Sequence, residues 1–164
     1  MELFHEHIDE FRKQLEKGSI QKAYRGLMKY IVSLRNYLKK KYPDYSVSGS
    51  IYYGYLDMTY FSIFPKTFKD RKLKIALVFL YEPFRFEVWL AGINKQVQAK
   101  YWKLIKENGW HQYRIVPTAQ GFDSIIEHIA VEEPDFRDLD ALTKQIEKET
   151  LKFIKDVKNF LAEH

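Results

Sequence analysis

The sequence predicts an α+β fold, in which helices pack on a mainly antiparallel sheet of about five or six strands. Apolar residues recur at helical spacing at both ends of the 164-residue chain, and β-branched and aromatic residues alternate in its middle. Two neighbouring segments near the centre also have the pattern of a hairpin. At this length one core can form without disulfides or metals, so we expect a single globular domain over residues 1–164.

Two helices are expected at the N-terminal end. A helix over residues 3–15 is indicated by four apolar residues at spacings of four, three and four: Phe4, Ile8, Phe11 and Leu15. Gly18 suits the left-handed end of that helix, and Ser19 can cap a second helix. The apolar stripe of the second helix runs from residue 20 to residue 42, where Pro43 makes continuation unfavourable.

Two strands are expected next, because β-branched and aromatic residues then dominate the sequence. They cover Val47–Leu56 and Met58–Phe64, with Asp57 near the turn between them. Gly49 and Gly54 indicate a bulge or a close approach of the backbone in the first of these strands. Residues 65–72 are expected to be a polar connection.

Residues 73–81 and 84–92 form the clearest unit, a hairpin joined through Glu82 and Pro83. The first of these strands is apolar on both faces toward its end, so we expect a central position in the sheet. In the second strand, Arg85, Glu87 and Trp89 share the more polar face.

The remaining elements are a mid-chain helix, two short strands and a long C-terminal helix. Asn94 can cap the mid-chain helix and Gly109 can end it. The short strands are expected over residues 111–116 and 124–131, on either side of a turn at Gln120 and Gly121. After Pro134, apolar residues recur at helical spacing almost to the end of the chain.

Charge is distributed unevenly along the chain. Residues 1–116 carry 21 basic and 11 acidic side chains, a net +10, whereas residues 117–164 carry 6 and 11, a net -5. The basic part could attract a polyanion such as nucleic acid. The alternative, which the modest total of +5 favours, is that the acidic segment balances the basic part internally.

Several classes of function are excluded by what the sequence lacks. It has no cysteine, which excludes disulfide scaffolds, thiolate metal sites and cysteine nucleophiles, and which fits a cytoplasmic location. It has no phosphate-binding loop, dinucleotide-binding glycine pattern or nucleophile elbow. No apolar stretch approaches the roughly 18 residues of a membrane span. The sequence therefore predicts no catalytic residue, metal, cofactor or membrane partner.

One polar and aromatic cluster is the best candidate for a binding site. If the hairpin and the mid-chain helix are placed correctly, Arg85 and Glu87 share a strand face and the start of the helix follows that strand directly. A helix N-terminus with basic and amide side chains nearby can hold an anion. The predicted function is thus a non-enzymatic binding or interaction module for a small anionic or polar ligand. The candidate residues are Tyr52, Arg85, Glu87, Trp89, Asn94, Lys95 and Gln98.

Two other functions stay open at this point. Tyrosines of the first strands, such as Tyr52 and Tyr60, with nearby bases such as Lys74, could stack on and neutralise a single-stranded nucleic acid. Asp57 and Glu87 have the loose arrangement of a metal-dependent hydrolase of unfamiliar type, but the lysine that such a site needs is missing after Glu87.

Three stretches of the chain resemble a family of small uncharacterised bacterial proteins, a domain of unknown function. They are DYSVSGSIYYGYLDMTYF at residues 44–61, LKIALVFLYEPFRFEVWLAGINKQVQAKYW at residues 73–102, and IIEHIAVEEPDF at residues 125–136. The resemblance extends over nearly the whole chain. It implies a stand-alone cytoplasmic bacterial protein with no established activity, and it assigns no role to the polar cluster.

Overall fold

The computed structural model of the protein describes Met1 and residues 3–164, and it divides into two compact units, residues 1–36 and 37–164. The first unit contains helix α1 (Phe4–Glu16) and most of helix α2 (Ser19–Lys41). Gly18, with a φ of +78°, ends α1 in the left-handed conformation that the sequence predicts. Both N-terminal helices are therefore confirmed.

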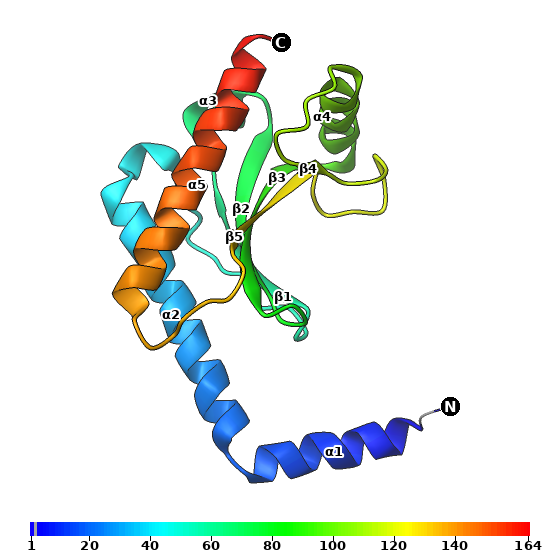
Figure 1. The fold of residues 1–164 in the computed structure, drawn as a ribbon, viewed down its shortest axis with the longest axis vertical. Helices are drawn as coiled ribbons and strands as arrows, with labels where there is room; N and C mark the ends of the chain where they lie inside the picture. The colour runs from blue at the N-terminus through cyan, green and yellow to red at the C-terminus, as the bar shows by residue number, and fades with distance from the viewer. Residues whose placement is uncertain (2) are drawn as a thin grey trace. The chain divides into compact units, whose positions relative to one another are not determined.

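The second unit contains a five-stranded sheet, which confirms the predicted fold class (Figure 1). Its strands are β1 (Met58–Ile63), β2 (Leu73–Leu80), β3 (Arg85–Gly92), β4 (Arg114–Ile115) and β5 (Ile126–Val131). They are ordered β1-β2-β3-β5-β4, and every neighbouring pair is antiparallel. The hairpin of β2 and β3 is confirmed, and β2 lies inside the sheet, as expected for a strand that is apolar on both faces toward its end.

The helices of this unit are the end of α2, the short α3 (Lys66–Asp70), α4 (Lys95–Glu107) and α5 (Leu139–Ala162), with a turn of 3-10 helix over Pro43–Tyr45. The α5 helix lies along one face of the sheet and covers it with buried residues such as Phe153 and Val157 (Figure 1). Among the described residues, no helix is both long enough and apolar enough to cross a lipid bilayer.

Three predicted elements differ from the structure. Residues 47–56 are not a strand, because only Val47 and Tyr52 form isolated bridges with β1, and Gly54, at a φ of +74°, turns the backbone between them and β1. The connection over residues 65–72 contains the helix α3. The strand predicted over residues 111–116 contains only two strand residues.

The two faces of the sheet have different compositions. Leu77, Phe79, Phe86 and Val88 belong to the face under α5, where register pairs Leu77 with Val88 and Phe79 with Phe86. The opposite face carries a smaller apolar cluster of Ala76, Val78 and Trp89, against which Met58, Tyr60 and Leu80 pack. We call this opposite side the aromatic face, and it holds most of the predicted site residues.

Candidate functional site

A hollow of about 520 Å³ lies over the aromatic face. Its floor comes from β1, β2 and β3, and its walls come from the start of α4, the loop before β5 and the segment before β1. The lining includes five of the seven predicted site residues, Tyr52, Trp89, Asn94, Lys95 and Gln98, together with Asp57, Met58, Tyr60, Lys74, Ala76, Ala91, Gly92, Phe122 and Asp123. We call it the sheet pocket.

The start of α4 is fixed against the end of β3 by a close backbone approach. The Asn94 side chain accepts a hydrogen bond from the Val97 amide at 2.9 Å, which confirms the predicted N-cap. The amide of Gly92 donates to Oε1 of Gln98 at 3.0 Å. A Cβ at position 92 would lie only 2.6 Å from the Gln98 backbone nitrogen, so glycine is required for this approach.

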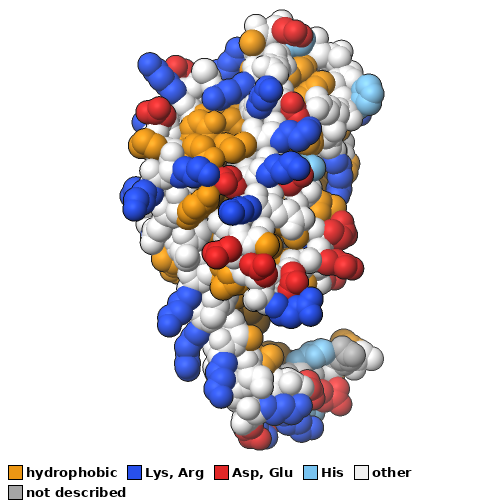
Figure 2. All heavy atoms as spheres, turned by 60° about the vertical axis from the view of Figure 1, so that its left-hand side comes forward, with side chains coloured by type: hydrophobic (Ala, Val, Ile, Leu, Met, Phe, Trp, Pro, Cys, Tyr) orange, Lys and Arg blue, Asp and Glu red, His pale blue; other side chains and the backbone are white. Residues whose placement is uncertain are grey.

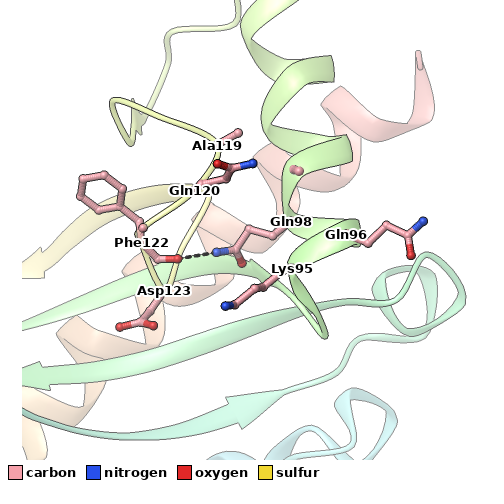
Figure 3. Close-up of a pocket in the computed structure, with 9 residues that line it drawn as sticks. Lys95, Gln96, Gln98, Ala119, Gln120, Phe122 and Asp123 are labelled. Atoms are coloured by element: carbon pink, nitrogen blue, oxygen red, sulfur yellow. Dashed lines mark hydrogen bonds between the residues drawn. The ribbon is translucent and has the colours of Figure 1, made fainter.

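Gln98 also ties the loop before β5 to α4. Its Nε2 donates to the carbonyl of Phe122 at 2.7 Å, 24 residues further along the chain (Figure 3). Both residues of this contact also line an adjoining hollow of about 630 Å³, which shares Lys95, Gln98, Phe122 and Asp123 with the sheet pocket. Both ends of the Gln98 amide are thus used to shape the walls of the site.

Two tyrosines and a lysine form one side of the sheet pocket. Tyr52 and Tyr60 exchange two backbone hydrogen bonds of 2.9 Å, and their ring centroids lie 5.1 Å apart. The Lys74 ammonium lies 5.7 Å from the centroid of the Tyr60 ring, a cation–π distance. Burial raises the pKa of the Tyr60 phenol, and the negative charge of Asp123, which lines the same pocket, raises it further.

Arg85 and Glu87, the other two predicted residues, form an ion pair and do not line the sheet pocket. Arg85 Nε donates to Glu87 Oε2 at 2.7 Å, and Arg85 also reaches Glu132 at 3.3 Å. Glu87 is only 2% exposed, and its other oxygen accepts a hydrogen bond from Trp89 Nε1 at 2.9 Å. Glu87 lines a different, smaller hollow of about 250 Å³ with Tyr113 and His128. Trp89 is therefore the link between this ion pair and the sheet pocket.

Asp57 and Glu87, the pair that could suggest a hydrolase, line different hollows. Asp57 holds a turn, because its Oδ1 accepts from the Tyr55 amide at 2.8 Å. Hydrogen bonds from the backbone amides of Tyr55 and Met58 lower the pKa of the Asp57 carboxyl. Across Met1 and residues 3–164, no three His, Cys, Asp or Glu side chains are grouped so that they could hold a metal ion.

Sequence reasoning did not place Phe122 and Asp123 in the site. They belong to the loop between β4 and β5, which the hydrogen bond from Gln98 holds against α4. Tyr60 and Lys74 were signalled, but in connection with nucleic acid. The shared face of Tyr60 and Lys74 follows from the strand alternation of β1 and β2, and the isolated bridge to Tyr60 adds Tyr52.

A family model described as a domain of unknown function (DUF7000) matches residues 4–161. No curated protein and no solved structure matches the chain. The match confirms the resemblance, predicted from three stretches of the sequence, to a domain family without an assigned activity.

Proposed function

We propose that this chain, which belongs to the DUF7000 family of domains of unknown function, is a binding module for a small, flat, anionic molecule. The observation that carries the proposal is the composition of the sheet pocket. Rings of Tyr52, Tyr60 and Trp89 line it together with two ammonium groups, those of Lys74 and Lys95. Its volume lies within the range of roughly 300–1,000 Å³ that is usual for small-molecule sites.

Two lysines of the pocket offer a place for an anionic group on the ligand, beside the carboxylates of Asp57 and Asp123. Within the described residues, neither Lys74 nor Lys95 forms an ion pair, so both are available to a carboxylate or phosphate. The Asp57 carboxyl already accepts a backbone hydrogen bond from the turn. Asp123 adds a carboxylate acceptor to the lining, which suits a ligand that also carries a hydroxyl or amino group.

The aromatic floor favours a ligand with a planar body. Offset or tilted stacking on tyrosine and tryptophan rings contributes specific affinity beyond the burial of area. Trp89 is held in place by its hydrogen bond to the buried Glu87, so its ring is fixed before any ligand arrives. A fixed ring loses less conformational entropy on binding.

The test is a titration of the full chain with two probes, adenosine monophosphate and indole-3-acetate. Each combines a planar ring system with one anionic group. We expect at least one to raise the thermal midpoint of the chain, and Lys74→Ala or Lys95→Ala to weaken its affinity about tenfold, the effect of one charge-assisted hydrogen bond. The matched control is Lys103→Ala, which removes an exposed lysine of α4, the helix that begins at Lys95. A parent chain that responds to neither probe, or a Lys95→Ala variant that binds as well as the parent, would contradict the proposal.

A nucleic-acid partner is the second candidate, and one observation favours it. Residues 19–36 carry four basic and no acidic side chains, and Figure 2 shows basic groups in a row along this part of α2. Binding of a single-stranded oligonucleotide should then weaken steeply with salt. It should also be lost in a Lys22→Ala, Arg25→Ala, Lys29→Ala triple variant and kept in Lys103→Ala.

We also propose that the protein is bacterial and that it is located in the cytoplasm. A bacterial source is supported by the family resemblance of the three sequence stretches quoted above. A cytoplasmic location is supported by the complete lack of cysteine, since small domains of oxidising compartments usually contain disulfides.

A further inference from the structure

The α1 helix presents an apolar stripe that the rest of its own unit, the described residues of 1–36, does not bury. Phe4, Ile8 and Phe11 are 78%, 46% and 52% exposed, and none of the 13 residues of α1 is buried. Large apolar side chains at spacings of four, three and four are those of a helix that packs against another helix.

A helix of this length needs a packing partner. Isolated helices shorter than about 12–15 residues are marginal in water, and most helical stability in proteins comes from packing an amphipathic face. The local supports of α1 are weak by comparison. They include the hydrogen bond from the Leu3 amide to Glu6 and the Asp9–Arg12 ion pair, at 3.5 Å, between two exposed side chains.

The charges of α1 show which partner fits. Residues 4–10 carry three acids and no base, a net -3, whereas residues 11–17 carry three bases and one acid, a net +2. A second α1 in antiparallel orientation places the acidic half of each helix against the basic half of the other. A two-fold symmetric interface requires this kind of self-complementarity.

We propose that the partner is a second copy of this chain, bound through an antiparallel pair of α1 helices. The apolar stripe is symmetric about its middle, so Phe4 meets Leu15 of the second copy and Ile8 meets Phe11. Asp9 and Arg12 are one turn apart on the same side of the helix, as their 3.5 Å pair shows. In the dimer, Arg12 borders the stripe, so it lies beside the acidic half of the other copy, to which Asp9 belongs.

The interface is small, because one short helix from each copy contributes to it. Four apolar side chains per copy bury less than the roughly 800 Å² per partner of a standard stable interface. We therefore expect a reversible dimer that forms in the micromolar range or above and dissociates on dilution.

The first experiment measures the mass of the full chain by sedimentation at concentrations from micromolar to submillimolar. We expect the parent to shift from monomer to dimer and the double variant Phe4→Ser, Phe11→Ser to stay monomeric. The matched control is Tyr55→Ser, which removes a side chain that is 92% exposed in the other unit, and it should dimerise like the parent. A dimer that survives the double variant would overturn the role of α1.

The second experiment tests the antiparallel orientation and does not require loss of the apolar stripe. Asp9→Arg makes positions 9 and 12 both positive, and Arg12→Asp makes both negative, so each variant alone should dimerise at least about tenfold more weakly than the parent. An equimolar mixture of the two should recover dimers of parent strength, because opposite charges then face each other. Failure of the mixture to recover would overturn the antiparallel pairing.

A parent chain that stays monomeric at every concentration would overturn the proposal as a whole. If such a monomer instead co-sediments with phosphatidylcholine vesicles, and the Phe4→Ser, Phe11→Ser variant does not, the stripe belongs to a lipid surface and the dimer is wrong.

Discussion

Alternate residues of the same two strands form the two faces of the β2–β3 hairpin, yet the two faces differ in what they bury. Under α5, Phe79, Phe86 and Val88 are at most 1% exposed. On the aromatic face, apolar Val78 lies opposite the charged Glu87, and partly exposed Lys74 lies opposite Ala91. The covered face therefore stabilises the fold, whereas the aromatic face combines burial with charges that α5 does not cover. Substitutions should separate these two roles.

The largest expected effect is on the covered face. Phe86 packs against Phe79, with ring centroids 5.0 Å apart, and against Phe136 at 6.3 Å. Phe86→Ala should lower the free energy of unfolding by about 3–5 kcal/mol, because a fully buried ring leaves a cavity. Urea denaturation measures this loss, and Tyr55→Ala, at an exposed position, should change it by less than about 0.5 kcal/mol. A loss near 1 kcal/mol for Phe86→Ala would mean that the covered face is not the main core.

A smaller, pH-dependent effect is expected at Glu147, a buried carboxylate on the helix that covers this face. Burial acts to raise its pKa, but hydrogen bonds from Tyr42 at 2.7 Å, from Lys41 and from Tyr37 at 3.1 Å outweigh burial and lower it. Burial, and then the hydrogen bond to Glu147, raise the pKa of Tyr42 to about 12. Glu147 therefore stabilises the fold when it is ionised.

Glu147→Gln should lower the free energy of unfolding at pH 7 by about 1–3 kcal/mol. Because the folded-state pKa of Glu147 is lowered, its contribution is present above the unfolded value of about 4.3 and disappears as pH falls through the folded value. Denaturation of parent and variant between neutral pH and pH 3 should show the two curves converging on the acid side. A difference that is constant with pH would show that the loss comes from packing alone.

Part of the fold could be predicted from the sequence. The hairpin follows from the alternation of its side chains, and the start of α4 follows from Asn94 one residue before the helix. The Val47–Leu56 segment has strand composition, but its backbone turns at Gly54, where a Cβ would lie 2.0 Å from the Met58 carbonyl oxygen. The amino-acid composition of the segment does not predict this close approach of the backbone.

The candidate site was predictable to the same extent. Asn94, Lys95 and Gln98 lie within one helical turn after β3, so their shared position needed only the hairpin and the cap. Arg85 and Glu87 share a face, as predicted, but alternation could not show that Arg85 would turn to Glu132, 47 residues further along the chain. Phe122 is held at the site by its backbone carbonyl, a group that every residue has, so its residue type could not predict the contact.

A still smaller effect on stability is expected where the aromatic face joins the ion pair. Trp89→Phe keeps a ring over the sheet but removes the 2.9 Å donor to Glu87, one of whose oxygens then lacks its partner. We expect a loss of about 1–2 kcal/mol, since the carboxylate keeps its 2.7 Å pair with Arg85. The same change in a Glu87→Gln background should cost less if the two residues are coupled. Equal costs in both backgrounds would separate Trp89 from the ion pair.

The smallest expected effect is electrostatic and leaves the fold intact. Burial and the charge of Asp123 both raise the pKa of Tyr60, so Asp123→Asn should shift that pKa downward while burial keeps it above its ordinary value. Ultraviolet difference titration against a Tyr60→Phe reference isolates this one phenol, and an unchanged thermal midpoint serves as the control. The covered face offers no comparable measurement, because the side chains of Phe79, Phe86 and Val88 do not titrate. A Tyr60 pKa that does not move would show that Asp123 points away from the pocket and that Lys74 and Lys95 define its charge, which would strengthen the preference for a purely anionic ligand.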